Sequence, residues 1–375
     1  MEQRHGGLQA SDLAGTGLRT ADVLDFSSSL NPLGPPPAVR EALASFDPGR
    51  YPDPTCTELR GVLSERLGIS LDRILIGSGS TELIHLVVRL FVHRGQRPVV
   101  FAPTFSEFER AVGIAGGHAY PWTATPQRGF RWALRNKPGV LERVRPPLVW
   151  LCNPNNPTGV YLPRDRVELV ASALTEGPLL LDEAYAAFVD EPWSSLDLTQ
   201  TGRVILLRSM TKDYAIPALR LGYLVAHPDV VSAAAAIQPE WSVSGAAIVG
   251  GLAALRTKGY VEEGRRIAGE AKTYLCEALP AIGLEVVEGA ANFILVRAGD
   301  GPGLRMQLLR LGVAVRDCSS FGLPEYVRIG MRCIPDCERL VAAFAKLRAG
   351  GFETRPHEDG GTMDLDAGNV QTAEP

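Results

Sequence analysis

A lysine set among hydroxyl side chains is the residue best suited to covalent chemistry in this sequence. Lys212 follows an apolar run, is preceded by Ser209 and Thr211, and is followed eight positions later by Arg220. An amine beside hydroxyls and a guanidinium suits the formation of an imine next to a bound phosphate. A single lysine is usually a surface residue, so this segment needs support from other parts of the chain.

A carboxylate stands at the end of another apolar run. Asp182 follows Leu179–Leu181 and comes three residues before Tyr185. A carboxylate at the end of a buried strand is costly unless it meets a cation. A protonated pyridine nitrogen would serve as that cation. The alternative is that Asp182 caps the following helix, and the residues alone leave both interpretations open.

A stiff polar loop follows a third apolar run. It contains three asparagines and two prolines within residues 153–159, and Asn156 is at its centre. Loops at the carboxyl ends of strands are where open α/β sheets bind ligands. A plain turn would not need so many amides, so we expect this loop to contact a ligand.

A glycine-rich turn is the fourth candidate. Gly79, Ser80 and Thr81 lie between an apolar run and an amphipathic stretch, within Gly77–Glu82. Such a turn points backbone N–H groups and the positive end of a helix dipole at one spot, which suits a phosphate. A tight turn with a Ser or Thr helix cap explains the segment equally well, so phosphate binding stays one of two readings.

The elements that would position these residues are short buried strands alternating with helices. The strands are continuous apolar runs, as expected where both faces of a sheet are covered. The clearest helix starts at Ser80 and ends before Gly95. The predicted fold is a doubly wound α/β/α domain with a mixed, mainly parallel sheet, plus a smaller α+β domain. The candidate strands are Ile74–Ile76, Val99–Phe101, Leu148–Cys152, Leu179–Leu181, Val204–Leu207 and Tyr223–Ala226.

The change in pattern along the chain predicts four regions. Residues 1–45 are rich in Gly, Pro and Ser and form an N-terminal segment that joins the small domain. Residues 46–249 form the large domain and 250–350 the small one, with strands expected at Leu284–Val287, Phe293–Val296, Val313–Arg316 and Tyr326–Ile329. Residues 351–375 lack apolar periodicity and are predicted to be a disordered tail.

Composition excludes several classes of protein. The net charge is −4, acidic residues concentrate after Gly350, and no basic run stands out, so nucleic acid and anionic membranes are not expected partners. No apolar run approaches the ~20 residues that span a bilayer, and no signal core is present, which predicts a cytoplasmic protein. Cys333 and Cys337 are the only close pair of cysteines, with no His nearby to complete a site, so no metal is expected.

Taken together and in this order, the four motifs resemble those of the fold-type-I pyridoxal-5′-phosphate (PLP) transferases, the aspartate-aminotransferase superfamily, over nearly the whole chain. The resemblance implies PLP as the cofactor, held by Lys212 as a Schiff base. It also implies that Asp182 keeps the pyridine nitrogen protonated, and that Asn156 and Tyr185 hydrogen-bond the ring hydroxyl. The phosphate would be held by residues of the glycine turn and of the lysine segment, namely Gly79, Ser80, Thr81, Ser209, Thr211 and Arg220.

Three further roles follow from the same resemblance. Phe105 would stack on the ring face. Tyr51 would reach the cofactor phosphate of a neighbouring subunit, which implies a homodimer with shared sites. Arg328 would grip a substrate carboxylate with its planar guanidinium.

Within this superfamily the local sequence is most similar to the L-threonine-O-3-phosphate decarboxylases of cobalamin synthesis. The similar segments are His5-Gly6-Gly7, Asn31-Pro32-Leu33-Gly34, the stretch after Lys212, Trp241-Ser242-Val243, and Val315-Arg316-Asp317-Cys318 with the later Arg328 and Arg332. The resemblance therefore implies a decarboxylase that forms (R)-1-amino-2-propanol O-2-phosphate. The residues expected near this phosphorylated amino acid are His5, Gly6, Asn31, Arg316, Arg328 and Arg332.

Two alternatives remain open at this point. A histidinol-phosphate-type aminotransferase shares the motifs and would pass the amino group to 2-oxoglutarate. A PLP-binding domain without turnover is the other, and the complete set of Lys212, Asp182, Asn156, Tyr185 and Arg220 argues against it. The aminotransferase and the decarboxylase differ in whether the Cα–H or the Cα–carboxylate bond is held perpendicular to the cofactor ring.

Overall fold

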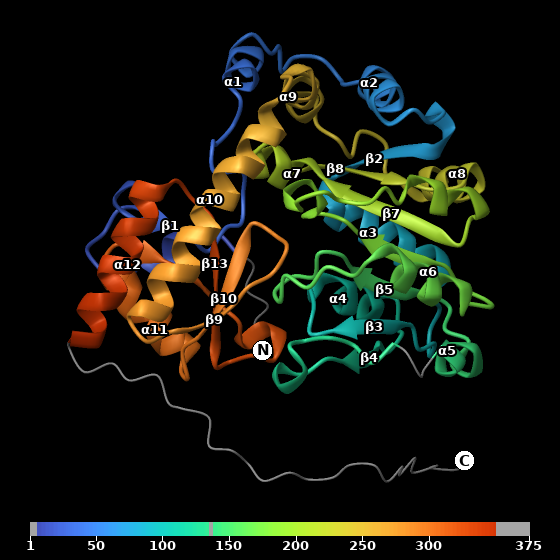
Figure 1. The fold of residues 1–375 in the computed structure, drawn as a ribbon. Coiled ribbons are helices and arrows are strands. Elements are labelled where there is room, and N and C mark those ends of the chain that lie inside the picture. The colour runs from blue at the N-terminus through green and yellow to red at the C-terminus, as the bar shows by residue number, and fades with distance from the viewer. Residues whose placement is uncertain (1–5, 135–137, 350–375) are drawn as a thin grey trace.

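The computed structural model describes residues 6–134 and 138–349. A large sheet with helices on both faces occupies one side of the molecule, and a smaller sheet with its own helices occupies the other (Figure 1). His5 and the predicted tail at 351–375 lie outside the described residues. No helix in the described ranges is long and apolar enough to cross a membrane.

The large sheet has seven strands. Strand β8 runs antiparallel to both of its neighbours, and all other pairs are parallel. In spatial order the strands are β2 (Ile74–Ser78), β8 (Leu221–Val225), β7 (Val204–Ser209), β6 (Leu179–Asp182), β5 (Val149–Cys152), β3 (Val99–Ala102) and β4 (Tyr120–Thr123).

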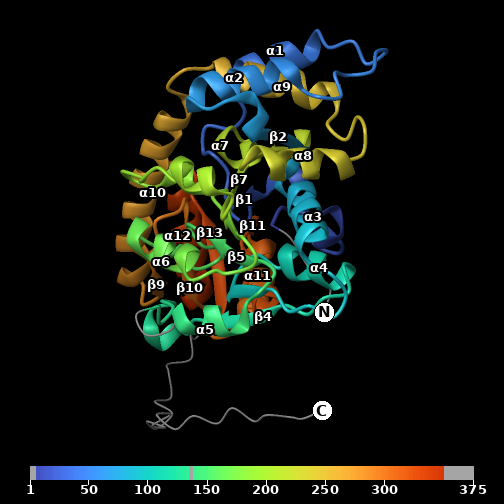
Figure 2. The same ribbon diagram turned by 90° about the vertical axis from the view of Figure 1, so that its right-hand side faces the viewer.

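Successive residues of the central strands enter two separate cores. In β6, Leu179 and Leu181 pack into the core beneath α2, α6 and α9, while Leu180 packs into the core beneath α3, α4 and α8. Figure 2 shows α3 and α6 on opposite sides of the sheet. Both faces of the strand are therefore buried, which is why its sequence is a continuous apolar run. The predicted doubly wound α/β class is confirmed.

Twelve α-helices lie within the described residues. They are α1 (Pro37–Ala44), α2 (Thr57–Leu67), α3 (Gly79–Phe91), α4 (Glu107–Ile114), α5 (Pro138–Val144), α6 (Arg164–Ser172), α7 (Met210–Asp213), α8 (Pro228–Ile237), α9 (Gly245–Arg256), α10 (Tyr260–Ala281), α11 (Gly301–Arg310) and α12 (Ile334–Ala349).

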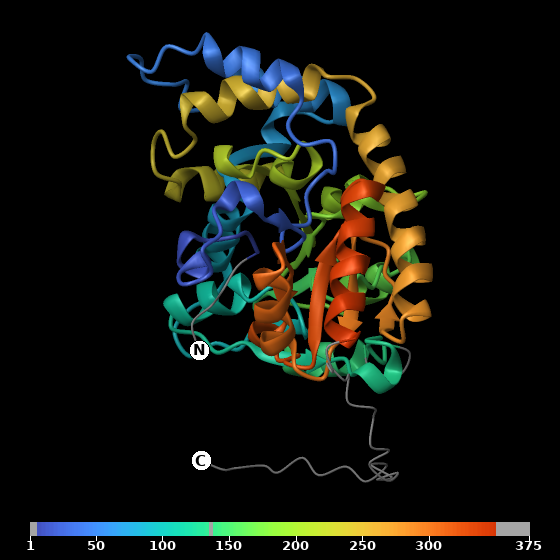
Figure 3. The ribbon, with the colours of Figure 1, turned by 90° about the vertical axis from the view of Figure 1, so that its left-hand side faces the viewer.

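The smaller part of the molecule is built on an antiparallel sheet. Its strands in spatial order are β12 (Arg316–Asp317), β13 (Tyr326–Gly330), β10 (Phe293–Arg297) and β9 (Glu285–Val287). A parallel pair, β1 (Leu24–Asp25) with β11 (Val313–Ala314), ties the N-terminal segment to it. Helices α10 and α12 pack side by side along this sheet (Figure 3).

The structure differs from the sequence-based expectation in three elements. The strand expected at Val313–Arg316 is two strands in different sheets, because the chain leaves β11 at Val315 and pairs with β13 from Arg316 onward. Edge strand β4 was not predicted, since it is mostly exposed and contains Pro121. Helix α9 crosses the boundary expected at residue 249 and packs on α1 and α2, so the chain passes to the smaller sheet only along α10.

Candidate active site

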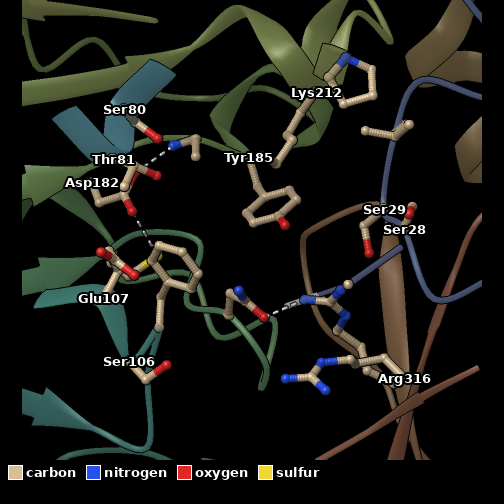
Figure 4. A pocket seen from close by; sticks show the side chains of 18 of the residues that line it. Ser28, Ser29, Ser80, Thr81, Ser106, Glu107, Asp182, Tyr185, Lys212 and Arg316 are labelled. Atoms are coloured by element: carbon tan, nitrogen blue, oxygen red, sulfur yellow. Dashed lines mark hydrogen bonds between the residues drawn. The ribbon is translucent and has the colours of Figure 1, made fainter. Parts of the chain in front are cut away.

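A cavity of about 670 Å³ opens between the large sheet and the smaller one (Figure 4). It lies at the carboxyl ends of the central parallel strands, the usual ligand position in open α/β sheets. All four motifs of the sequence contribute to its wall. The predicted site residues that line it are Gly6, Ser80, Thr81, Phe105, Asn156, Asp182, Tyr185, Lys212, Arg220, Arg316 and Arg328.

One end of the cavity is an anion cradle. Ser80 and Thr81 lie in the first turn of α3, where backbone N–H groups have no partner within the helix. Gly79 precedes them at φ +75°, and a Cβ on it would come within 2.6 Å of Arg220 Nη2. Glycine is required here because it lets the guanidinium approach the turn. The cradle combines a helix N-terminus with a cation, which suits a phosphate.

Lys212 projects into the cavity from α7, directly after β7. Its Nζ donates a hydrogen bond to Thr211 Oγ1 at 2.9 Å, and Ser209 Oγ lies 2.6 Å from the same hydroxyl. Burial and then the neighbouring Arg220 lower the pKa of Lys212 to about 8. A lysine with this pKa keeps a sizeable unprotonated fraction near neutral pH, as a nucleophilic amine must.

Asp182 forms the floor of the cavity at the end of β6. Its carboxylate accepts a hydrogen bond from Ala184 N at 2.9 Å and lies 3.8 Å from Cys152 Sγ. Burial raises the pKa of Asp182 to about 6, although the charge of Lys212 opposes the shift. A cation bound against this carboxylate would lower its pKa again and offset the cost of burying it.

Arg328 and Asn156 meet on the opposite wall. Arg328 Nη1 donates to Asn156 Oδ1, and its Nη2 donates to Ser27 O at 2.9 Å. The guanidinium also lies 5.0 Å from the ring of Phe293, against which Tyr185 packs edge-on. Arg328 is 4% exposed, so it is a buried cation whose hydrogen bonds go to neutral oxygens. Such a cation favours an anionic ligand.

Arg316 brings a second buried guanidinium to the same wall. It pairs with Arg328 across β12 and β13, directly opposite in register. Ser320 Oγ accepts a hydrogen bond from Arg316 Nη2 at 2.6 Å, and the Phe321 ring lies 5.3 Å from the guanidinium. Burial and the neighbouring Arg328 lower the pKa of Arg316 to about 10. Two cations side by side suit a ligand group with more than one negative charge, such as a phosphate.

A flat cofactor with a phosphate, a ring nitrogen and an aldehyde fits this donor set. The anion cradle matches the phosphate, the buried carboxylate of Asp182 matches a protonated ring nitrogen, and Lys212 matches the aldehyde. Phe105 lines the same cavity and offers a ring for stacking. The residues present thus agree with the PLP that the sequence resemblance implies. No group of three or more metal-ligating side chains is present within the described residues.

Several predicted residues lie outside this cavity. Asn31 sits behind the lysine segment, where its N–H donates to Lys212 O at 3.0 Å and its Nδ2 to Asp213 O at 2.9 Å. Arg332 pairs with Asp336 at 2.7 Å and lines a neighbouring cavity. Tyr51 is 83% exposed and packs on Trp241, with ring centroids 4.8 Å apart.

The cavity also contains residues that the sequence did not single out. Glu107, in the first turn of α4, is 2% exposed and bonds His85 at 2.7 Å and Arg110 at 2.8 Å. The sequence offered one signal that Glu107 could line the cavity, namely its position two residues after Phe105. Phe321 reaches the cavity from a short 3₁₀ turn, and nothing in its local sequence marks it.

Comparison with known proteins gives one family. The model of aminotransferase class I and II matches residues 21–344. The histidinol-phosphate aminotransferase of Moorella thermoacetica is 33% identical over 340 residues, covering 88% of this chain and 87% of that protein. The histidinol-phosphate aminotransferase of Symbiobacterium thermophilum is 34% identical over 333 residues, covering 86% and 90%.

Solved structures agree with this fold. Histidinol-phosphate aminotransferase from Sinorhizobium meliloti, in complex with PLP, superposes with a TM-score of 0.79 at 26% identity, covering 86% of this chain and 90% of that one. L-Threonine-O-3-phosphate decarboxylase from Porphyromonas gingivalis superposes with a TM-score of 0.75 at 25% identity, covering 86% and 99%.

The prediction of a threonine-phosphate decarboxylase is contradicted by these relatives. Curated proteins at 30–34% identity are histidinol-phosphate aminotransferases. The segments that suggested the decarboxylase are short, and only Gly6, Arg316 and Arg328 of the described substrate residues that they predicted line the cavity. These relatives also do not support the carboxy-lyase reaction and the cobalamin product that the sequence had led us to expect.

Proposed function

The chain belongs to the aminotransferase class I and II family, and we propose that it transfers the amino group of histidinol phosphate to a 2-oxo acid, 2-oxoglutarate. The observation that carries the proposal is the cross-strand pair Arg316–Arg328 in the cavity that contains Lys212. Curated relatives with this activity, at 33% and 34% identity, support it.

The cofactor is PLP, which supplies an aldehyde that captures amines and a ring that accepts electrons from the substrate Cα. The protein's own residues supply the rest. Lys212 Nζ would remove the proton from the substrate Cα, because its lowered pKa leaves part of it unprotonated, and would hold that proton beside the cofactor site. The Asp182 carboxylate would accept the hydrogen bond of a protonated ring nitrogen, and Phe105, which lines the same cavity, would stack on the ring.

The charge of the cavity agrees with two phosphorylated ligands. Cationic side chains outnumber the two carboxylates of Asp182 and Glu107. Arg220 faces the cradle at α3, and we assign the substrate phosphate to Arg316 and Arg328, which stand opposite each other on β12 and β13. The same two arginines would take the carboxylates of 2-oxoglutarate, because a guanidinium binds carboxylate and phosphate through similar paired hydrogen bonds.

We further propose that the active form is a homodimer in which Tyr51 completes the partner's cofactor site. Tyr51, Trp241 and Leu33 are large apolar side chains that the described chain leaves 83%, 44% and 39% exposed. Tyr51 and Trp241 pack on each other and form a compact aromatic patch. Exposed aromatic residues of this kind are enriched at protein interfaces.

The test is a transamination assay with the purified full-length chain. Histidinol phosphate and 2-oxoglutarate should give glutamate, and histidinol without its phosphate should react much more slowly. Release of CO₂ from threonine phosphate, with no glutamate formed from histidinol phosphate, would overturn the proposal.

A further inference from the structure

The turn that begins α3 contains a carboxylate that the proposed reaction does not use. Glu82 is half-buried, and its Oε2 accepts a hydrogen bond from Ser78 N at 2.6 Å. Ser78 is the residue immediately before Gly79 and the cradle amides. The Glu82 side chain therefore holds the backbone of Ser78, at the start of the anion cradle.

The same oxygen ties this turn to a distant loop. Gln238 Nε2 and Ser242 Oγ both lie 3.2 Å from Glu82 Oε2. Gln238 also donates to Ile76 O on β2 at 2.9 Å. One carboxylate oxygen thus joins the end of β2, the start of α3 and the segment between α8 and α9.

The cradle has little room to absorb a movement of Ser78. A Cβ on Gly222 of β8 would come within 2.7 Å of Ser80 N, and a Cβ on Gly79 would meet Arg220 at 2.6 Å. The turn is therefore packed closely between β8 and the arginine. A shift of Ser78 would be passed directly to the amides of Ser80 and Thr81.

A negative charge this close to a phosphate site needs a reason. Like charges repel, and a neutral side chain would cap α3 without that cost. The three donors at Glu82 Oε2 share its charge, and charge-assisted hydrogen bonds fix geometry more firmly than neutral ones. We propose that Glu82 is a positioning residue for the cofactor phosphate, which it serves by fixing Ser78 and so aiming the cradle amides. This inference rests on the proposed cofactor site.

The experiment compares two cofactor forms that differ only in the phosphate. The full-length chain, stripped of cofactor, is titrated with PLP and with pyridoxal. The Glu82→Ala variant should bind PLP about tenfold more weakly, because a charged acceptor of a half-buried N–H is lost, and should bind pyridoxal within about twofold of the wild type. The Glu82→Gln variant keeps an acceptor for Ser78 N. It should therefore recover most of the wild-type preference for PLP over pyridoxal.

Two further variants keep the test decisive. Glu58→Gln, an exposed carboxylate paired with Arg256 on the surface, should leave both affinities unchanged. Ser242→Ala removes one donor and should reduce the preference for PLP about twofold, even if Glu82→Ala does not fold. Equal weakening of both forms, or no weakening of either, would overturn the inference and leave the proposed function standing. A wild type with no preference for the phosphorylated form would instead contradict the cofactor site itself.

Discussion

At the scale of single residues, the cross-strand arginines suit the phosphorylated amine that we propose as the substrate. Arg316 and Arg328 are 5% and 4% exposed and stand directly opposite each other on β12 and β13. Like charges placed opposite on adjacent strands are destabilising. A phosphate dianion bound between them would relieve this repulsion, so a phosphorylated substrate would gain binding energy that a neutral one would not.

Removing one of these arginines should weaken substrate binding selectively. Arg316→Ala should raise the KM for histidinol phosphate about 10- to 100-fold, since a hydrogen bond to a charged group contributes about 1.5–3 kcal/mol. The KM for histidinol should change little. Steady-state kinetics measures both values.

Arg332 supplies the matched control for this prediction. It is also a partly buried arginine of the smaller part, but it pairs with Asp336 and lines another cavity. Arg332→Ala should leave the ratio of the two KM values unchanged. Equal effects from both variants would mean that the loss is structural rather than due to the phosphate.

The lowered pKa of Lys212 predicts how cofactor attachment depends on pH. The unprotonated amine reacts, so the attachment rate in the cofactor-free chain should rise through about pH 8, rather than through about pH 10.4 as for an unperturbed lysine. Arg220→Gln removes a nearby positive charge and should move the midpoint to higher pH. Borohydride trapping followed by mass spectrometry gives the rate, and a wild-type midpoint near that of free lysine would refute this prediction.

Three of the predicted site residues that line the cavity share one property. Lys212, Asp182 and Asn156 each follow an apolar strand closely, and the carboxyl ends of parallel strands meet at one edge. Glu107 and Phe321 come into the cavity only through tertiary packing. Arg316 points into the cavity, whereas Arg332 does not, because that depends on the pairing of β12 with β13. Local sequence carries no signal for such pairing.

At the scale of elements, the polar loop after β5 and the turn between β9 and β10 touch backbone to backbone. A Cβ on Gly289 would lie 2.4 Å from Gly159 Cα, and Ala290 N donates to Gly159 O at 2.8 Å. This contact presses the loop that contains Asn156 toward the smaller sheet, where Arg328 binds it. The polar composition of the loop was visible in the sequence, but this partner was not.

A methyl group at this contact should loosen the site. Gly289→Ala should destabilise the fold by about 1–3 kcal/mol through overpacking and should lower kcat/KM, because Asn156 is displaced from Arg328. Gly269→Ala is the control: its Cβ would meet nothing within 4 Å on α10. It should stabilise the helix by up to about 1 kcal/mol and leave kcat/KM unchanged. Thermal unfolding and kinetics separate the two outcomes, and an unaffected Gly289→Ala enzyme would contradict the proposed contact.

At the scale of the whole molecule, the cavity is assembled from both sheets. The large sheet and its helices contribute the anion cradle, Asp182 and Lys212, while the smaller sheet contributes Arg316 and Arg328. The alternation of strands and helices was sufficient to predict the two-part architecture. It did not predict which arginine faces the cavity, because that requires the relative placement of the two sheets.

The proposed homodimer makes a prediction that only two different subunits together can test. Lys212→Ala chains lack the reacting amine, and Tyr51→Ala chains lack the side chain that would reach the partner's cofactor. In a hybrid dimer, the site with an intact Lys212 receives Tyr51 from the other subunit, so one complete site is restored. Random mixing in equal amounts makes half of the dimers hybrid, and about a quarter of all sites should then behave as wild type at limiting PLP. Activity that only averages the two separate variants would show that Tyr51 acts within its own chain or not at all.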